Sequence, residues 1–458
     1  MGFDAIWISP IVKNIEGDTA KGEAYHGYWT EDINSLNDHF GSADDLKSLV
    51  TALHDRKMYL MLDVVVNHFV ANPSSDSTSL PQSFDYSALK PFSDASDYHS
   101  ECFISNYDNQ TEVEGCWLGD TELPLLDVNT ENTEIVSAFN DWVAKVVSDY
   151  DIDAIRIDTV KHVRKDFWPD FVKASGVFSI GEVLQGDPQY VKDYTEVMDN
   201  VLDYPSWYPL IRAFTNTSGS LSELASTYTT TQSAFKNGLF TAGSFLENHD
   251  QARFQSHTTD SGLVANAVAW PFVNDGIPIL YYGQEQGYQG GEDPENREAL
   301  WFSGYEQDKP LYMQVKALNA ARKLAISKNS DFTSTASKFI DQPSDNVLAL
   351  SKPPLLTLLT NAGSSGSAEW TIPSSAGLFT GGETVVDLMT CKTFTVDSSG
   401  ELKASANNGQ PRVIIPTSQL DGSGCQTPDS ASVDGAFGVR TSVGVMMSAV
   451  VGLTFLVL

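Results

Sequence analysis

Apolar residues recur at two spacings along the first 328 residues, and the two spacings alternate. Residues 42–56, SADDLKSLVTALHDR, repeat at helical spacing, with Ser42 placed to cap the helix. Residues 58–66, MYLMLDVVV, are apolar too continuously for a half-exposed strand, which predicts a strand buried on both faces. Residues 132–150 again repeat at helical spacing. Further apolar runs predict strands at residues 3–9, 153–158, 176–183, 197–204, 242–248 and 277–283.

This alternation of strand and helix predicts a parallel sheet and, at this chain length, an α/β fold of the TIM (β/α)8-barrel type. The pattern supplies seven candidate strands instead of eight. A stretch rich in Ser, Asp, Asn and Pro interrupts it at residues 68–127 and is too long for a plain connection, so it predicts an inserted domain. Residues 1–67 and 128–328 then form the barrel.

Short alternating strands follow the barrel pattern after Lys328. They predict a separate antiparallel β domain over residues 329–425, with a hairpin turn at the SSG of TFTVDSSGELKAS. The other candidate strands of this domain are NVLALSK, LLTLLTN, AEWTIP and PRVIIP.

Charge and cysteine content narrow the class of protein. The net charge of -32, from 60 acidic and 28 basic residues, argues against nucleic acid and anionic membrane surfaces, because both need clusters of Lys and Arg. Solubility alone explains such a charge, which also suits a neutral substrate. Four cysteines in two sequence-local pairs suggest disulfides and an oxidising compartment, with free thiols as the alternative. Sequons at Asn109 and Asn216 are in keeping with secretion.

The two ends of the chain differ in character. Residues 1–4 have neither the basic nor the apolar region of a signal peptide and lead directly into a predicted strand. The spacer and tail at residues 426–458 end in the uncharged run SVGVMMSAVVGLTFLVL, which is typical of a GPI-attachment signal, with a short tail anchor as the alternative. Either anchor needs an entry signal, so we expect a signal peptide upstream of Met1.

Polar side chains gather where the predicted strands end. The carboxyl ends of all strands of a parallel barrel meet at one mouth, where active sites are built. Residues 241–250, TAGSFLENHD, show the pattern clearly, because an apolar run ends in four adjacent polar residues. The polar residues at these strand ends are Asp63, Asn67, His68, Arg156, Asp158, Lys161, His162, Glu182, Glu247, His249 and Asp250.

Carboxylates that converge on one mouth suit hydrolysis of a glycosidic bond. That reaction needs a protonated acid for the leaving oxygen and an ionised partner beneath the sugar. Crowded like charges raise the pKa of one group and keep it protonated near neutrality. Arg156 lies two residues before Asp158, on the same strand face, and could hold Asp158 ionised. Each motif alone has an ordinary explanation, since Asp and Asn are common where strands turn into loops.

The segments DVVVNH, AIRIDTVKH, GEVLQGD and FLENHD resemble, in combination, order and spacing, the four core motifs of the α-amylase family of glycoside hydrolases (family 13). The resemblance is closest to secreted fungal α-amylases and covers nearly all of residues 2–425. It implies a (β/α)8 barrel, an inserted domain B after the third strand, a β-sandwich domain C, and retaining cleavage of α-1,4-glucan through a covalent glycosyl-enzyme. Family members begin with a strand, a helix and a disulfide-bearing loop that have no counterpart here, so we expect a barrel without its first strand.

The resemblance also implies roles for individual residues. Asp158 matches the nucleophile, Glu182 the general acid/base, and Asp250 the carboxylate that grips sugar hydroxyls in the transition state. Arg156 matches the arginine that supports the nucleophile. The implied sugar-binding residues are His68 and His249 in the cleavage subsite, His26, Tyr28 and Trp29 of AYHGYW on the glycone side, Lys161 and His162 on the aglycone side, and Asp293 and Arg297 of DPENREALW.

Two of these segments have ordinary alternatives. AYHGYW, taken alone, is as readily an aromatic loop that packs on domain B. Asp293 and Arg297 are equally well explained as a surface salt bridge. Gln185 replaces an aspartate that close relatives often carry, which bears on the aglycone subsites.

A structural calcium ion (Ca²⁺) between barrel and domain B is a further implication. The residues that match its ligands offer hard oxygen donors of the kind calcium prefers. They are the side chains of Asn67, Glu114 and Asp127 and the carbonyl of His162. Leu125 replaces an aspartate in the segment LPLLD, close to these ligands. The pairs Cys102 with Cys116 and Cys391 with Cys425 match family disulfides.

Three functions fit this sequence. The first is an extracellular, monomeric endo-acting α-amylase on starch or maltooligosaccharides. The second is a GPI-anchored 4-α-glucanotransferase that remodels cell-wall α-glucan, which the C-terminal tail favours. The third is a non-catalytic glucan-binding protein, against which the intact carboxylates argue.

Overall fold

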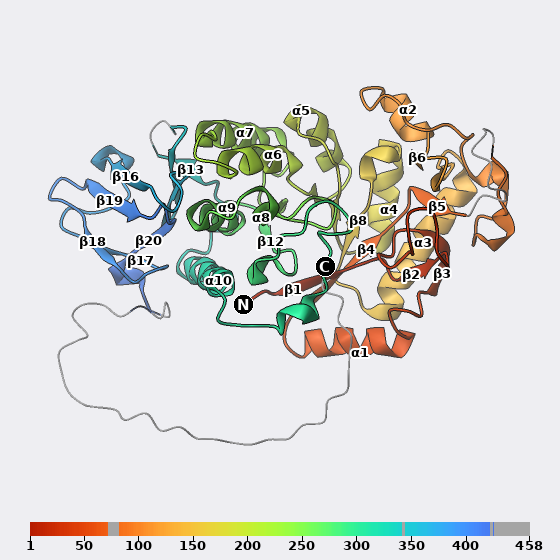
Figure 1. Ribbon diagram of the computed structural model, residues 1–458, viewed down its shortest axis with the longest axis horizontal. Coiled ribbons are helices and arrows are strands. Elements are labelled where there is room, and N and C mark those ends of the chain that lie inside the picture. Colours follow the sequence, from red (N-terminus) through yellow and green to blue (C-terminus); the bar gives the residue numbers. More distant parts are fainter. Residues whose placement is uncertain (72–81, 341–343, 422–424, 426–458) are drawn as a thin grey trace, which may run out of the picture.

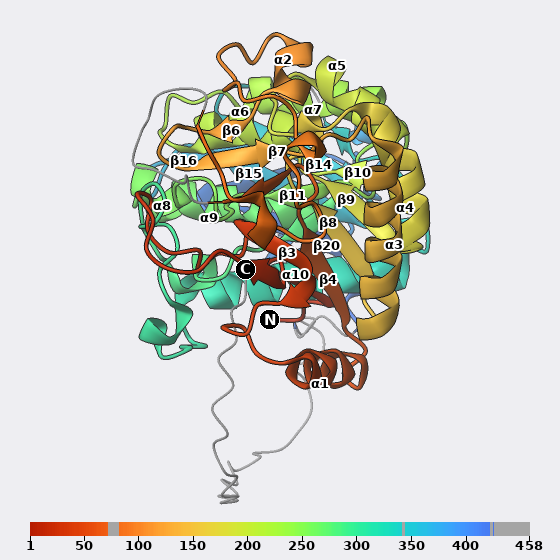
Figure 2. The same ribbon diagram turned by 90° about the vertical axis from the view of Figure 1, so that its right-hand side faces the viewer.

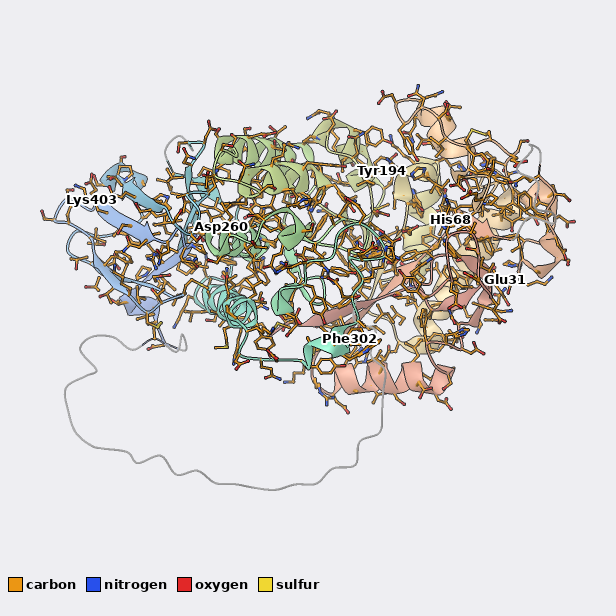
Figure 3. All side chains as sticks on the ribbon, in the orientation of Figure 1. Glu31, His68, Tyr194, Asp260, Phe302 and Lys403 are labelled. Atoms are coloured by element: carbon orange, nitrogen blue, oxygen red, sulfur yellow. A yellow bond between two sulfur atoms is a disulfide. The ribbon has the colours of Figure 1, made fainter. Side chains whose placement is uncertain are left out.

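The structure is a computed structural model that describes residues 1–71, 82–340, 344–421 and 425. A parallel barrel surrounded by helices forms its centre, and an antiparallel β sandwich lies at one end (Figure 1). Lys403 of the sandwich and Glu31 lie at opposite ends of the long axis (Figure 3). No helix among the described residues combines the length and apolar character needed to cross a membrane. The predicted tail at residues 426–458 lies outside the described residues.

All seven strands that the sequence predicts for the barrel are present and parallel. Their order is β1-β4-β8-β9-β10, followed by β11-β12, and the bridge between Leu202 and Gly243 joins the two groups. The fold is therefore the predicted TIM-type barrel. The strands span Ala5–Ile8 (β1), Tyr59–Val64 (β4), Ala154–Ile157 (β8), Phe178–Gly181 (β9), Asn200–Val201 (β10), Gly243–Phe245 (β11) and Ile277–Ile279 (β12).

The barrel wall is open between its first and last strands. Within the described residues, β1 pairs only with β4, and β12 pairs only with β11. Ile277 at the start of β12 is 40% exposed, although it belongs to an apolar strand. Trp7 of β1 and Ile279 of β12 line the same narrow cavity of about 20 Å³. Side chains of the two edge strands thus line one cavity inside the barrel, together with Leu202 and Phe245.

Helices cover the outside of the barrel, and their sequences explain their ends and faces. Ser42 accepts a hydrogen bond from the backbone N–H of Asp45, as expected of a cap, and the Asp45 side chain accepts from the Ser42 backbone N–H, which makes a capping box of α1. Helix α9 is apolar on all sides because it lies between barrel strands and the C-terminal sandwich. The main helices span Ala43–His54 (α1), Thr133–Tyr150 (α3), Trp168–Ser175 (α4), Pro188–Val191 (α5), Tyr204–Phe214 (α6), Leu221–Ala234 (α7), Phe254–His257 (α8), Ser261–Val273 (α9) and Pro310–Lys328 (α10).

The segment between β4 and α3 forms a small antiparallel sheet that lies beside the hairpin of β2 and β3 (Figure 2). A disulfide joins Cys102 to Cys116 around helix α2. The elements are β2 (Val12–Asn14), β3 (Thr30–Leu36), β5 (His68–Val70), α2 (Gln110–Gly115), β6 (Leu118–Gly119) and β7 (Pro124–Asp127).

The C-terminal sandwich packs a six-stranded sheet against a two-stranded one. One prediction is wrong here: TFTVDSSGELKAS is no hairpin, because β18 pairs with β17 in one sheet and β19 with β16 in the other. The SSG turn therefore connects the two sheets. A disulfide joins Cys391 to Cys425. The strands are β13 (Lys338–Phe339), β14 (Val347–Lys352), β15 (Leu355–Thr360), β16 (Ser367–Ile372), β17 (Thr384–Asp387), β18 (Thr393–Thr395), β19 (Leu402–Asn407) and β20 (Arg412–Pro416).

Candidate active site

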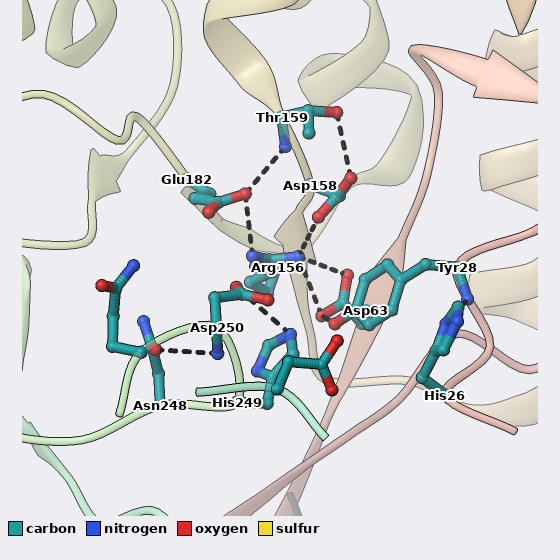
Figure 4. A network of polar contacts seen from close by, with 12 residues as sticks. His26, Tyr28, Asp63, Arg156, Asp158, Thr159, Glu182, Asn248, His249 and Asp250 are labelled. Carbon is teal, nitrogen blue, oxygen red and sulfur yellow. Dashed lines mark hydrogen bonds and ion pairs between the residues drawn. The ribbon is translucent and has the colours of Figure 1, made fainter. Parts of the chain in front are cut away.

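Arg156 of β8 is the centre of a buried cluster at the barrel mouth (Figure 4). Its Nη1 contacts Asp158 Oδ1 at 2.7 Å and Asp63 Oδ1 at 3.0 Å, and its Nη2 contacts Glu182 Oε2 at 3.0 Å. The three carboxylates come from the ends of neighbouring strands β4, β8 and β9, whose parallel register brings them together. One guanidinium fork thus binds three carboxylates that are distant in sequence.

Thr159 forms hydrogen bonds to two of these carboxyl groups, those of Asp158 and Glu182. Its φ of 47° lies in the left-handed region, which is uncommon for a β-branched residue. This turn lets its backbone N–H donate to Glu182 Oε2 at 3.1 Å and its hydroxyl donate to Asp158 Oδ2 at 3.0 Å. The strained backbone therefore fixes both carboxyl groups, as is common at functional sites.

Asp158 and Glu182 have opposite pKa shifts. Burial disfavours the charge of Asp158, but Arg156, His68 and the hydrogen bonds from Arg156 and Thr159 together outweigh burial and hold the pKa of Asp158 below its usual value. Burial raises the pKa of Glu182 to about 8, the charges of Asp158 and Asp250 add to the rise, and Arg156 opposes it. At neutral pH Asp158 is therefore ionised and Glu182 protonated.

Asp63 closes the floor of the cluster. It is 1% exposed and accepts hydrogen bonds from Tyr28 Oη at 2.7 Å and Trp7 Nε1 at 3.0 Å, in addition to its ion pair with Arg156. Burial raises its pKa to about 7, against the effect of Arg156. Its contacts are to protein groups that support Arg156.

His249 and Asp250 follow β11 on the opposite side of the mouth. The Asp250 side chain is 35% exposed, whereas that of His249 is buried. The His249 ring stacks on Tyr28 at a centroid distance of 5.3 Å, and its Nε2 lies 3.5 Å from Asp250 Oδ2. Asn248 Oδ1 accepts from the Asp250 backbone N–H at 3.0 Å. Asp250 is thus a held but accessible carboxylate that faces the Arg156 cluster.

The AYHGYW segment divides between the mouth and a small core. His26 stacks on Tyr28, and burial lowers the pKa of His26 to about 3. Trp29 packs with the apolar cluster that includes Val70 and Leu123, so its side chain contributes to packing on the inserted segment. His26 and Tyr28 therefore lie at the site, while Trp29 supports it.

His68 is buried at the start of β5, and its Nε2 lies 3.0 Å from the Tyr28 carbonyl. Lys161 Nζ donates to the Leu184 carbonyl at 2.9 Å and lies over the ring of Tyr107 at 5.1 Å. His162 is 5% exposed and directs Nδ1 to the Val113 carbonyl at 3.2 Å, so its ring faces α2.

Arg297 connects the segment DPENREALW to the mouth. Its Nε donates to the His249 carbonyl at 3.0 Å, and its Nη2 lies 3.6 Å from Asp250 Oδ1. It also pairs with Asp293 at 3.2 Å, on the outer, half-exposed side. The salt bridge and the contact with the site are therefore both present.

Three of the four residues that match calcium ligands converge. Asn67 Oδ1 lies 3.0 Å from Asp127 Oδ1 and 3.2 Å from the His162 carbonyl oxygen, so three acceptors face one another. Two arrangements would remove the repulsion between these three oxygen atoms. If the Asn67 amide is reversed, its NH2 group donates to Asp127 and to the His162 carbonyl; if it is not, a hard cation can bind all three oxygens. Glu114 lies nearby on α2, where its Oε1 accepts from Gln110 Nε2 at 2.7 Å. In the described ranges, no group of three or more His, Cys, Asp or Glu side chains is arranged for a metal ion.

Sequence patterns did not find Trp7, Thr159 or Tyr204 as parts of the site. Trp7 and Thr159 act through side-chain direction and backbone conformation, which no local motif encodes. The Tyr204 hydroxyl accepts a hydrogen bond from Asn248 Nδ2 at 2.7 Å and so helps to hold Asn248 beside Asp250. Glu247, which its place at a strand end assigns to the mouth, is 2% exposed and pairs instead with Arg253.

A TIM barrel with two neighbouring carboxyl groups at its mouth, one with a lowered and one with a raised pKa, has the kind of active site found in glycoside hydrolases. The family model of the α-amylase catalytic domain matches residues 1–342, and that of α-amylase domain C matches residues 343–433. The chain belongs to the α-amylase family of glycoside hydrolases.

Individual relatives agree with this assignment. An α-amylase of Saccharomycopsis fibuligera is 45% identical over 416 residues, which are 91% of this chain and 82% of that protein. Alpha-amylase 2 of Schwanniomyces occidentalis is 45% identical over 428 residues, which are 93% and 82% of the two chains. The structure of an α-amylase from Malbranchea cinnamomea is similar with a TM-score of 0.88 at 42% identity and covers 93% of this chain and 88% of its own.

Proposed function

We propose that this chain is an α-amylase that hydrolyses internal α-1,4-glucosidic bonds of starch-like glucans with retention of configuration. The observation that carries the proposal is the shared contact of Arg156 with Asp158 and Glu182, which have opposite pKa shifts. Retaining glycosidases need two carboxyl groups about 5–5.5 Å apart, one ionised and one protonated. A common guanidinium and Thr159 keep these two groups close.

In the first step, a carboxylate oxygen of Asp158 attacks the anomeric carbon of the bound sugar. The bond from that carbon to the glycosidic oxygen breaks, and Glu182 donates its proton to the departing oxygen. Asp158 is suited to attack because Arg156 keeps it ionised, and Glu182 is suited to donate because burial keeps it protonated. The product is a glycosyl ester of Asp158.

In the second step, ionised Glu182 accepts a proton from water, whose oxygen attacks the same carbon and releases the Asp158 carboxylate. Asp250, accessible and held by Asn248, is placed to bind sugar hydroxyls in the distorted transition state. Tyr28, His68 and His249 enclose the same position. Lys161 and Arg297 extend the surface on either side.

The decisive experiment is Asp158→Asn with product analysis on maltooligosaccharides. We expect turnover to fall to background while the melting temperature stays close to that of the wild type; near-normal turnover would remove Asp158 as nucleophile. With the wild type, glucose and maltose indicate hydrolysis. Longer oligosaccharides would indicate transfer to a sugar hydroxyl, as in a 4-α-glucanotransferase, and unchanged substrate would indicate a binding protein.

We infer that Asn67, Asp127, Glu114 and the His162 carbonyl would hold a structural calcium ion. The three acceptors that already face one another support this inference. Calcium would supply a rigid connection between β4, β7 and the turn after β8. We expect EDTA to lower the melting temperature and added Ca²⁺ to restore it; indifference to both would contradict the site.

We also infer that the protein is extracellular, with residues 68–127 and 329–425 as domains B and C. The two disulfides favour an oxidising compartment. Asn109 and Asn216 are exposed, as attached glycans require. Enzymatic removal of N-glycans should shift the electrophoretic mobility of the secreted protein, and the shift should be lost in an Asn109→Gln/Asn216→Gln double variant. This result would support secretion and glycosylation, and the absence of a shift would count against glycosylation.

A further inference from the structure

Glu247 and Arg253 form a buried ion pair just behind the mouth. Arg253 Nη1 lies 3.2 Å from Glu247 Oε2, and the two side chains are 0% and 1% exposed. The guanidinium lies over the ring of Tyr281 at 4.1 Å. Glu247 Oε1 also accepts from the Phe254 backbone N–H at 3.1 Å. Neither side chain can touch a substrate, so their role in the reaction must be indirect.

Arg253 connects three separate segments of the chain. Besides Glu247 at the end of β11, its Nη1 donates to the Tyr282 carbonyl after β12 at 2.6 Å, and its Nε donates to Glu298 Oε2 at 3.0 Å. Its backbone N–H donates to the Gly290 carbonyl at 3.0 Å, and Glu298 Oε1 accepts from the Gly290 N–H at 2.7 Å. The loop at residues 290–298 is thereby fixed to the strand that leads into the site.

The same loop holds Asp250 from the other side. Asn296, which is 0% exposed, donates from Nδ2 to the carbonyls of His249 at 3.0 Å and Gln251 at 2.9 Å. Arg297 donates to the His249 carbonyl and contacts Asp250 Oδ1 at 3.6 Å. Both flanks of Asp250 are therefore set by residues 296 and 297, which adjoin Glu298, the partner of Arg253.

We propose that Arg253 is a positioning residue for Asp250, acting through Glu298 and the loop at residues 290–298. This inference rests on the proposed function of the site. A planar fork is required, because three acceptors in different directions have to be bound at once, and a lysine ammonium is a point charge that cannot span them.

The test compares Arg253→Lys with Arg322→Lys, a matched control. Arg322 is also buried and also binds backbone carbonyls, those of Phe272, Asn274 and Gly276, at the opposite end of β12 from the mouth. We expect Arg253→Lys to lower kcat between about 10- and 100-fold, because small displacements of a positioned group have effects of this size. KM should change little, since Asp250 acts mainly on the transition state.

The pH profile separates positioning from general loosening. Asp250 is one of the charges that raise the pKa of Glu182, so a displaced Asp250 moves the basic limb of kcat/KM to lower pH in Arg253→Lys. Arg322→Lys should lower the melting temperature and leave that limb in place. An unmoved limb with wild-type kcat in folded Arg253→Lys, or an equal shift in Arg322→Lys, would overturn the proposal.

Glu298→Gln provides a second variant, should Arg253→Lys fail to fold. The Glu298 side chain is 28% exposed, so its replacement disturbs the core less. We expect the same downward movement of the basic limb, and a wild-type limb would overturn the proposal. A wild type inactive on maltooligosaccharides would contradict the proposed function itself, whereas an active wild type matched by its Arg253→Lys variant would contradict only the role of Arg253.

Discussion

Arg156 and Arg253 are both almost fully excluded from solvent near the barrel mouth, yet their surroundings differ. Arg156 faces three carboxylates, of which Asp158 and Glu182 are the proposed reacting groups. Arg253 faces Glu247 and Glu298, a backbone carbonyl and the ring of Tyr281. Arg156 acts on the carboxyl side chains that react, whereas Arg253 acts on the backbone segment that carries Asp250.

The difference explains why similar burial leads to different functions. A buried guanidinium must be compensated by nearby charges, and both arginines meet that requirement. Around Arg156, burial keeps the proton on Glu182, the charges of Asp158 and Asp250 add to this effect, and Arg156 opposes it. Around Arg253 the compensation has a mechanical result, because it joins three segments of chain. Both arginines have more than one carboxylate beside them, so what distinguishes the two regions is that Arg156 contacts the proposed reacting groups Asp158 and Glu182 directly.

After Asp158→Asn, the largest effect is expected for Glu182→Gln. Loss of a general acid lowers the rate about 10²–10⁴-fold. The loss should be much smaller for an aryl maltooligoside with an acidic leaving group, which departs without a proton, and kcat on starch and on the aryl substrate would show this. Asp158→Asn gives a control, because no leaving group restores a missing nucleophile. Equal losses on both substrates would contradict the acid role of Glu182.

Arg156→Lys sharpens the comparison with Arg253→Lys. A lysine cannot bind Asp63, Asp158 and Glu182 together, so electrostatic support of the nucleophile is lost, and kcat/KM should fall about 10²–10³-fold, as for removal of a preorganised donor. The effect should exceed that of Arg253→Lys, because Arg156 contacts the reacting groups. Steady-state kinetics of both variants, with melting temperatures as a control for folding, would test the order. A reversed order would mean that the loop matters more than the charge cluster.

The pH dependence of the wild type tests the protonation states of Asp158 and Glu182. Activity needs ionised Asp158, whose pKa is lowered, and protonated Glu182, whose pKa is raised to about 8. The plot of kcat/KM should therefore be a broad bell that rises below pH ~4, the ordinary carboxylate range, and falls near pH 8. Two raised pKa values also affect stability. Between the ordinary carboxylate pKa of about 4 and the raised values of about 7 for Asp63 and about 8 for Glu182, the folded state keeps protons that the unfolded chain releases. The contribution of these two groups to the free energy of unfolding therefore declines as the pH rises from about 4 to about 8. A falling limb near pH 5 would contradict the assignment of Glu182.

Sequence patterns predicted much of the fold and the reacting half of the site. The strands of the barrel are continuous apolar runs, and Asp158, Glu182 and Asp250 stand at their ends in motifs that resemble a known family. The role of Glu247 could not be predicted, because a strand end indicates proximity to the mouth and not the direction of a side chain. The sandwich turn at SSG was misread for a similar reason, since a local turn signal does not say which sheet each strand joins. Thr159 depends on a left-handed backbone conformation that its residue type disfavours.

The smallest effect is expected for Asp293→Asn, at the edge of the Arg253 region. Asp293 pairs with Arg297 at 3.2 Å, but its side chain is 52% exposed, and exposed pairs contribute about 0–1 kcal/mol to stability. Arg297 keeps its bond to the His249 carbonyl without Asp293, so Asp250 stays in place and kcat should not change.

A sugar-binding role of Asp293 predicts a higher KM for maltooligosaccharides, whereas a plain salt bridge predicts no change in KM. We expect the higher KM, because Asp293 also accepts from Tyr25 Oη at 3.3 Å and so belongs to the exposed aromatic rim beside His26. Kinetics on maltooligosaccharides of increasing length would measure it, and a lowered kcat would mean that the outer pair, like Arg253, positions Asp250.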